Sequence, residues 1–335
     1  MIDIHSAAPP MTRLPVCICT DLGYDPDDLL ALVIAAAALP LRLVVTSDEF
    51  GGGERARLAR YLLNLCGRTG VVVIAGEEIE GAEARWVCDG LVPSDFPPSS
   101  MPITGSTVEA VRTVLGEGHR AAWIGQGPVS NLAWLYKCAP ELARRLVITL
   151  MGGGPAHLYR DPSRASHNPR MDPASATAIW TAPDLDLRLV TSDVTFTTET
   201  EITRDSEVYR LLAADNAPKW ARLVADGYSR WFARKRPGSK AADPMAVTAA
   251  AGLPFVKFEP VRVKIGSDAR MHLDPNGTEL RLSTAADYAG FRGWVTMVVR
   301  HALESGMGYD PSLIGRLPSA PGPATAGAAS IGSWS

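Results

Sequence analysis

The chain has 335 residues, of which 46% are hydrophobic, 21% charged and 7% aromatic. This composition is close to that of an average globular protein and excludes a disordered chain or a collagen-like repeat. The 33 basic residues do not outnumber the 36 acidic ones, which gives a formal net charge of −3. Neither nucleic acid nor a membrane surface is therefore an expected partner.

The chain lacks signals for export or membrane insertion. Its N-terminus has no basic segment followed by an apolar one, so a secretory signal is not expected. The longest apolar stretch, residues 29–41, contains Pro40 and is too short to cross a bilayer. The five cysteines are scattered without a zinc-ligand spacing and are expected to be reduced. A cytoplasmic protein is predicted.

Short apolar segments alternate with amphipathic ones along most of the chain. Strands are expected at residues 14–20, 41–46, 71–75, 121–124, 146–151 and 187–191. Helices are expected at residues 27–38, 54–66, 107–115, 131–136 and 173–181. Apolar strands separated by helices predict an α/β fold, a mainly parallel open sheet with helices on both faces.

The pattern changes in the last third of the chain. Residues 206–236 are predicted to be helical, residues 255–282 to form short strands with an Asn276-Gly277 hairpin signal, and residues 286–303 to form a last helix. We expect one α/β domain over residues 13–316. It follows a loose leader at 1–12 and precedes a flexible tail, rich in Ala, Gly, Pro and Ser, at 317–335.

The most informative segment follows the first strand and carries four carboxylates within eight residues: Asp21, Asp25, Asp27 and Asp28. Open α/β sheets bind ligands at the carboxyl ends of their strands. Carboxylates crowded in this way raise one another's pKa unless a cation offsets the repulsion, and a hard divalent cation suits oxygen ligands. The alternative is a solvated loop whose last Asp caps the helix, but one cap needs only one carboxylate.

Three later segments also follow strands or open helices. Asp243 precedes Pro244 at the start of an apolar helical run, and taken alone it is an ordinary helix N-cap. Gln126 lies between two glycines, and Met151 begins a Met-Gly-Gly-Gly segment. Glycines there let backbone carbonyls approach a ligand. The first of these segments is not a dinucleotide fingerprint, because Ser130 stands at the third glycine position.

Together these segments resemble the inosine-uridine-preferring nucleoside hydrolase family. The resemblance spans roughly residues 14–305 and rests on ordered motifs at residues 21–28, 127–132, 147–153, 168 with 172–173, and 243–247. It implies a calcium ion at the bottom of a pocket, where the ion binds a water and the ribose 2′ and 3′ hydroxyls. It also implies ligands from Asp21, Asp28, Asp243 and the Gln126 carbonyl, with Asp21 placed to take the proton of the attacking water.

Other residues are assigned by the same resemblance to the substrate. Asp27 would accept a hydrogen bond from a ribose hydroxyl, Asn168 would hold the sugar from the other side, and Asp25, in a two-residue extension of the turn, could displace one of these roles. Further candidate contacts are Asp48, Glu49, Met151 and His157. A hydrogen-bonded structural histidine or a surface histidine is the alternative interpretation for His157, as it is for His167.

The sequence departs from the family at four positions. Cys19 replaces the first Asp of the turn, Ala242 replaces a His before Asp243, Ser166 replaces a Glu, and an Asn of the loop after Met151 is replaced around Arg160. The last two positions would contact the 5′ hydroxyl, so the sequence does not determine which group the substrate carries at its 5′ end.

An aromatic helical segment precedes Asp243. Tyr228 and Trp231 are three residues apart and share one helical face, so they are predicted to stack on the base; the alternative is that they belong to the core.

The leading prediction is calcium-dependent hydrolysis of the N-glycosidic bond of a ribonucleoside or 5′-modified nucleoside, which gives base and ribose or a ribosyl derivative. The alternative is a protein of this fold that binds calcium and a ribosyl ligand with little or no turnover. The expected partner is a small nucleoside-like substrate, and the expected assembly is a homodimer or homotetramer.

Overall fold

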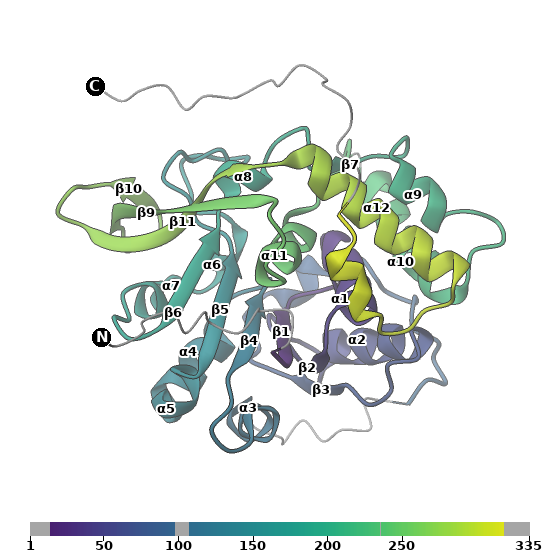
Figure 1. Ribbon diagram of the computed structural model, residues 1–335, viewed down its shortest axis with the longest axis horizontal. Helices are drawn as coiled ribbons and strands as arrows, with labels where there is room; N and C mark the ends of the chain where they lie inside the picture. The colour runs from purple at the N-terminus through teal and green to yellow at the C-terminus, as the bar shows by residue number, and fades with distance from the viewer. Residues whose placement is uncertain (1–13, 98–106, 235, 318–335) are drawn as a thin grey trace, which may run out of the picture.

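A mainly parallel sheet forms the centre of the computed structural model, which describes residues 14–97, 107–234 and 236–317. Within these residues nine strands join in the order β10-β9-β11-β6-β5-β4-β1-β2-β3 (Figure 1). Their bounds are β1 Val16–Thr20, β2 Leu41–Thr46, β3 Val72–Ala75, β4 Ala121–Gly125, β5 Leu146–Met151, β6 Asp186–Val190, β9 Val256–Ile265, β10 Met271–Leu273 and β11 Thr278–Ala286. Pairing is parallel from β3 through β6 to β11 and antiparallel between β9 and its two neighbours.

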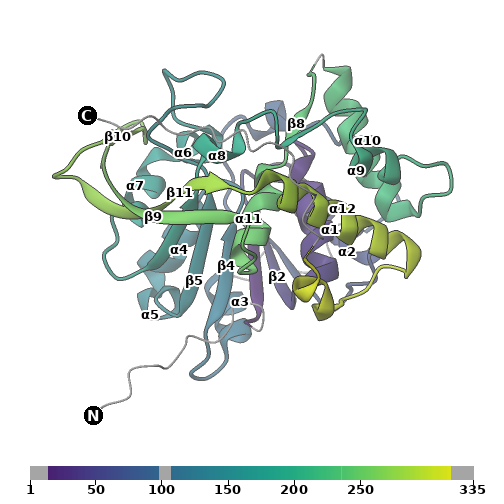
Figure 2. The same ribbon diagram turned by 45° about the horizontal axis from the view of Figure 1, so that its top comes forward.

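Helices lie on both faces of the sheet, as Figure 2 shows from a second direction. The α-helices are α1 Asp27–Ala38, α2 Glu54–Leu65, α3 Thr107–Leu115, α4 Ser130–Cys138, α5 Pro140–Ala143, α6 His167–Met171, α7 Pro173–Trp180, α8 Ser192–Thr195, α9 Glu207–Leu212, α10 Lys219–Ala233, α11 Ala242–Ala250 and α12 Tyr288–Glu304. Two 3₁₀ turns, η2 Ala82–Arg85 and η3 Pro311–Gly315, and a small ladder of β7 Glu201–Ile202 with β8 Ser239–Lys240 complete the described elements.

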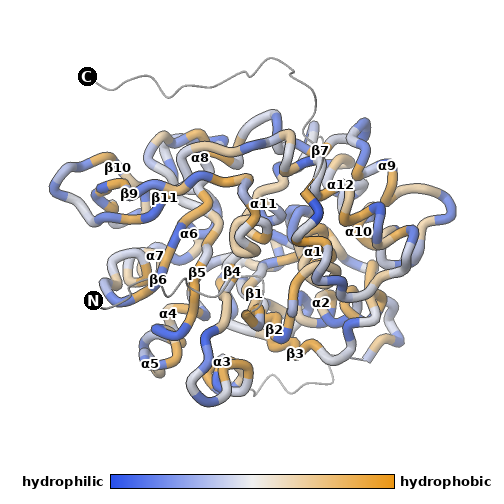
Figure 3. Tube along the Cα trace, viewed as in Figure 1, coloured by the Kyte–Doolittle hydropathy of each residue, from blue (hydrophilic) through white to orange (hydrophobic). Residues whose placement is uncertain are grey.

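Each face of the sheet has its own hydrophobic core. Along β1, Val16 and Ile18 pack with α1, α2, α10, α11 and α12, whereas Cys17 and Cys19 pack with α3, α4, α5 and α7. This alternation follows from the period of two in a strand, and burial on both faces explains the near-continuous apolar sequence. Figure 3 shows this apolar character in the strands around β1 and β2, while hydrophilic residues are more frequent in β9 and β10.

The fold positions the candidate site through the carboxyl ends of neighbouring parallel strands. Thr20 at the end of β1 pairs with Thr46 of β2, and Gly125 at the end of β4 pairs with Leu150 near the end of β5. The segments that begin at Asp21 and Gln126 therefore leave the same edge of the sheet. No helix among the described residues is long and apolar enough to cross a membrane.

The predicted fold class is confirmed, and the differences are local. The helical segment 206–236 is divided into α9 and α10 by residues 213–218. Asn276-Gly277 does not join partner strands, because β10 and β11 pair with opposite sides of β9. The leader predicted at 1–12, and all of the predicted tail except Leu317, lie outside the described residues.

Candidate active site

The acidic turn reverses the chain just after β1. Gly23 has φ of 105°, and a Cβ built there would lie 2.3 Å from a ring carbon of Trp86, so only glycine fits. The Gly23 carbonyl accepts a hydrogen bond from the Val87 amide at 2.8 Å. This reversal returns the following carboxylates to the end of β1, where α1 begins at Asp27.

A buried guanidinium holds the start of the turn. Arg55 of α2 is fully buried and donates to the backbone carbonyls of Asp21 and Leu22, the second at 2.7 Å. It also donates to the Asp48 carbonyl at 2.7 Å and forms an ion pair with the Asp48 carboxylate at 3.0 Å. One cation therefore fixes the backbone from which Asp21 projects.

Three carboxylates converge beneath the turn from two helices. Oxygen atoms of Asp27, Asp28 and Asp243 lie within 4.8 Å of one another, and all three residues are buried. Burial and mutual repulsion raise the pKa of each of these carboxyls well above its ordinary value. Such crowding is unfavourable in the absence of a compensating positive charge.

The alternative interpretation of Asp28 and Asp243 as helix caps is wrong, since Asp243 lies inside α11 and does not cap it. Asp28 accepts a hydrogen bond from the Thr20 hydroxyl and does not cap α1. Asp27 instead caps α11, because its Oδ2 accepts the amides of Ala242 and Asp243 at 3.0 and 3.1 Å. The Oδ1 of Asp243 is buried without a hydrogen-bond partner among the described residues.

The donor set fits a hard divalent cation. Asp27, Asp28 and Asp243 supply only oxygen ligands, and Asp243 offers an unpaired buried oxygen toward them. Oxygen donors without thiolate or imidazole suit calcium or magnesium better than zinc. A second group, Asp21, Asp48 and His167, is less suitable because Asp48 is already paired with Arg55 and Arg85.

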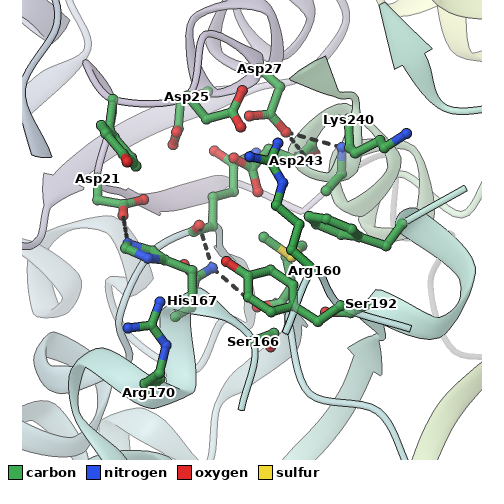
Figure 4. A pocket seen from close by; sticks show the side chains of 18 of the residues that line it. Asp21, Asp25, Asp27, Arg160, Ser166, His167, Arg170, Ser192, Lys240 and Asp243 are labelled. Atoms are coloured by element: carbon green, nitrogen blue, oxygen red, sulfur yellow. Dashed lines mark hydrogen bonds and ion pairs between the residues drawn. The ribbon is translucent and has the colours of Figure 1, made fainter. Parts of the chain in front are cut away.

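Asp25 lies at the edge of the same cluster. It accepts a hydrogen bond from the hydroxyl of Ser239 in β8. Burial raises its pKa to about 6, although the Ser239 hydroxyl and the charge of Arg160 oppose the increase. The two-residue extension of the turn therefore adds a further carboxylate to this floor, which Figure 4 shows together with Asp27 and Asp243.

The ends of β4 and β5 provide backbone oxygens. The Asn168 amide donates to the Gln126 carbonyl at 2.6 Å and to the Met151 carbonyl at 3.3 Å, so it links the two strand ends. A Cβ at Gly127 would lie 2.9 Å from the Asp21 amide nitrogen. Glycine there lets the Gln126 segment approach the acidic turn closely.

These residues line one cavity of about 430 Å³. Of the predicted site residues, the structure brings together Asp21, Asp25, Asp27, Asp28, Gln126, Met151, Asn168, Trp231 and Asp243. A volume of this size is in the range of small-molecule sites. The site residues come from segments that are far apart in the sequence and meet at one sheet edge.

Tyr24, Tyr159 and Phe196 line the cavity and were missed by sequence reasoning, and His167 was given no role in the site. His167 has its Nε2 3.4 Å from an Asp21 carboxylate oxygen, and its ring stacks with Tyr24 at 6.1 Å between centroids. Tyr24 also meets the Trp231 ring edge-on at 5.5 Å. Of the two alternatives for His167, the surface position is wrong, because the residue lines the cavity next to Asp21. Its position next to Asn168 was the available signal.

Six cationic side chains also line the cavity: Arg85, Arg160, Arg164, Arg170, Arg236 and Lys240. Of these the sequence drew attention only to Arg160. They come from separate loops and short elements and share no spacing that could have grouped them.

Asp48 and Glu49, predicted as sugar contacts, do not line the cavity. Both are buried. Asp48 forms ion pairs with Arg55 and Arg85, and Glu49 accepts the Ala56 amide at 2.8 Å, which satisfies the first turn of α2. Their position after β2 is at the correct edge, but their carboxylates serve the fold.

Tyr228 and His157 also lie outside the cavity lining. Tyr228 is fully buried behind the acidic turn with its ring 6.0 Å from Phe232, so the core alternative is correct for it. His157 lies beside His272, 5.1 Å between ring centroids, in a neighbouring hollow with Asp193. Whether each of these residues lines the cavity depends on packing, which the spacing in the sequence does not reveal.

Two of the departures from the family pattern have clear positions. Cys19 lies in the core on the other face of the sheet, where burial raises the pKa of its thiol to about 12, so it is no substitute for a carboxylate. Ala242 lines the cavity beside Asp243 but carries no proton-transferring group.

Comparison with known proteins gives matches over most of the chain. Residues 16–292 match the family described as inosine-uridine preferring nucleoside hydrolase. The pyrimidine-specific ribonucleoside hydrolase RihA of Enterobacter sp. (strain 638) is 27% identical over 222 residues, which cover 63% of this chain and 70% of that protein. Matches to RihA of several Salmonella strains cover 57% of those proteins.

Solved structures share the fold. The inosine-guanosine nucleoside hydrolase has a TM-score of 0.70 at 19% identity and covers 85% of this chain and 98% of its own. The type III effector protein XopQ, solved in complex with adenosine diphosphate ribose, has a TM-score of 0.67 at 16% identity and covers 87% and 94%. The match over residues 16–292 places the chain in the inosine-uridine preferring nucleoside hydrolase family, whose members are N-glycosyl hydrolases.

Proposed function

We propose that this protein is a calcium-dependent N-ribohydrolase acting on a ribonucleoside or a 5′-modified ribonucleoside. The observation that carries the proposal is the convergence of buried carboxylates at one strand edge, with an unpartnered Asp243 oxygen among them. We assign the ligands to Asp21, Asp28, Asp243 and the Gln126 carbonyl. A carboxylate oxygen of Asp27 lies within 4.8 Å of those of Asp28 and Asp243, so Asp27 is a further candidate ligand.

The chain's own groups suit hydrolysis through an oxocarbenium-like state. A bound calcium ion would lower the pKa of the attacking water. Asp21 would accept the proton of that water, and His167, whose Nε2 is 3.4 Å away, would hold the Asp21 carboxylate in place. The remaining carboxylates would stabilise positive charge that develops on the sugar ring. No covalent nucleophile is required.

Two further groups would position the substrate. Asn168 is fixed by the strand-end carbonyls and would contact the sugar from the side opposite Asp27. Trp231 lines the cavity and would present its ring to the base. Ala242 has no group that could donate a proton to the departing base, which favours a base that leaves without protonation from that position.

The test is release of reducing sugar from a panel of ribonucleosides, 5′-modified ribonucleosides and 5′-nucleotides, with calcium or with a chelator. We expect sugar release that requires calcium, together with calcium binding by calorimetry. Calcium and ribose binding without sugar release would contradict turnover and support the binding-only alternative. Turnover at an equal rate with a chelator would contradict the calcium assignment.

The location and assembly belong to the same proposal. We propose a cytoplasmic homodimer or homotetramer. Light scattering on the purified chain tests the assembly, and a monomer at micromolar concentration would contradict it.

A further inference from the structure

The cationic side chains of the cavity fall into two groups. Arg85 is paired with Asp48, Arg164 with Asp161 at 2.7 Å, and Lys240 with Glu201 at 3.1 Å. Arg160, Arg170 and Arg236, which we call the basic mouth, form no ion pair with a carboxylate of the described residues. Three guanidinium groups thus face one cavity outside any ion pair, and of these Arg160 also acts through its charge on Asp25.

Aromatic rings hold two of these guanidinium groups in place. The Cζ atoms of Arg160 and Arg236 lie 5.7 and 5.3 Å from the centroid of the Trp231 ring, and Arg160 also lies 5.8 Å from the Phe196 ring. Contact with a ring face orients a guanidinium and leaves its N–H donors free. Two like charges against one ring repel each other, and an anion between them would relieve that repulsion.

The third guanidinium brings an unsatisfied donor. Arg170 is half-buried, and its Nε is buried without a hydrogen-bond partner among the described residues. Figure 4 shows Arg170 on the side of His167 and Arg160 reaching toward the carboxylates from the wall near Ser166. A buried N–H without a partner is rare in a native protein unless a ligand or water completes it.

The position of the basic mouth relative to the sugar indicates which part of the substrate carries the anion. By the resemblance, Ser166 and the Arg160 region stand where the family reads the 5′ hydroxyl with Glu and Asn. Ser166 lines the cavity, and its hydroxyl accepts the Gly153 amide at 2.8 Å. Replacing Glu by Ser removes a negative charge, and Arg160 adds a positive one. Both changes favour an anionic group at the 5′ end.

We propose that the basic mouth binds a phosphoryl group attached to the 5′ oxygen of the substrate, so that the preferred substrate class is a 5′-phosphorylated ribosyl compound. This inference rests on the proposed function. Arginine matches phosphate oxygens with paired N–H donors, and these charge-assisted bonds are stronger than those to a neutral hydroxyl. The acidic carboxylates would bind the sugar and cation while the basic mouth binds the phosphoryl group.

The primary test is calorimetric binding of ribose 5-phosphate and of ribose, with calcium and with a chelator. We expect the wild-type protein to bind ribose 5-phosphate about tenfold or more tightly than ribose. The preference should decrease between 50 and 500 mM salt, because these exposed and half-exposed charges are screened. Equal binding of the two compounds would overturn the proposal.

Variants locate the phosphoryl group. The double variant R160Q/R236Q should lose the preference for ribose 5-phosphate, whereas R222Q, at an exposed position of α10, should keep it. Circular dichroism and the melting temperature confirm that each variant is folded, and R170K tests the third guanidinium separately. A folded double variant that retains the full preference would overturn the proposal.

Turnover separates this inference from the proposed function. We expect kcat/KM to be higher for inosine and uridine 5′-monophosphates than for inosine and uridine, and ADP-ribose distinguishes a diphosphate from a monophosphate. Hydrolysis of the neutral nucleosides with no gain from phosphate would overturn the inference alone. Tight binding of ribose 5-phosphate without any turnover would overturn the hydrolase proposal and support the basic mouth.

Discussion

The two ends of the cavity differ in burial and in how the sequence encodes them. The floor carboxylates Asp21, Asp27, Asp28 and Asp243 are buried and follow a strand or open a helix. The basic mouth is exposed or half-exposed and comes from loops, a short helix and the segment after α10. A buried charge requires a permanent compensating partner, whereas water can solvate an exposed charge until a ligand binds. The floor therefore suits a resident cation, and the mouth suits a group that enters with the substrate.

The largest expected effect is at the floor. Substituting Asp243→Asn removes a proposed ligand and should lower kcat/KM about 10³-fold or more. The melting temperature in chelator should stay constant or rise, because one member of a repelling cluster is gone. Asp226→Asn, at an exposed position of α10, is the matched control. A near-normal rate for Asp243→Asn would remove this residue from the mechanism.

The next effect concerns the support of the floor. Arg55→Met should cost about 3–5 kcal/mol of unfolding free energy, because it leaves the buried Asp48 carboxylate with a single partner. Urea denaturation measures this cost. Arg112→Gln on α3, whose ion pair with Glu109 is exposed, should cost less than about 1 kcal/mol. Equal costs for the two variants would contradict the assigned role of Arg55.

A smaller effect is expected at the wall between floor and mouth. Trp231→Ala should lower kcat/KM about tenfold if the ring stacks on the base. The indole also donates to the Gly238 carbonyl at 3.0 Å, so the melting temperature must be measured beside the kinetics. Tyr228→Phe is the comparison, because Tyr228 lies behind the wall and its hydroxyl has no partner among the described residues. It should leave the kinetics unchanged.

The same contrast explains what could be predicted from the sequence. Asp21 and Gln126 follow parallel strands, and such strand ends must meet at one edge, so the floor was accessible from local pattern. Asp48 also follows a strand at that edge, but its carboxylate is paired with Arg55 and Arg85 and does not line the cavity. Helical spacing placed Tyr228 and Trp231 on one face without giving their depth.

Two of the three residues of the basic mouth, Arg170 and Arg236, were beyond sequence reasoning for a different reason. Arg170 lies in a five-residue helix, and Arg236 lies between α10 and β8. Neither position has a periodic pattern, and the motif around Arg170, which includes Asn168 and Asp172, carries no expectation of a basic residue. Only the folded chain brings them to the same cavity.

The smallest effect is a pH dependence that separates floor from mouth. In the cation-free protein the pKa of Asp25 is raised to about 6, and burial also raises the pKa of Asp27, Asp28 and Asp243 above the ordinary value. Between the unfolded and the folded pKa, the folded chain binds more protons than the unfolded chain. The contribution to stability is therefore present at low pH and is lost as the pH rises through the folded pKa.

In chelator the melting temperature should consequently rise by a few degrees when the pH is lowered from 7.5 to 5.5. Saturating calcium should stabilise the protein more at pH 7.5 than at pH 5.5, because protons and the cation compete for the same oxygens. Asp25→Asn should reduce the pH dependence, whereas R160Q/R236Q should leave most of it in place, since the pKa of Asp25 is governed first by burial and only then by the charge of Arg160. A melting temperature in chelator that increased with pH would contradict the crowded floor, because it would mean that these carboxylates are stabilised as anions without a cation.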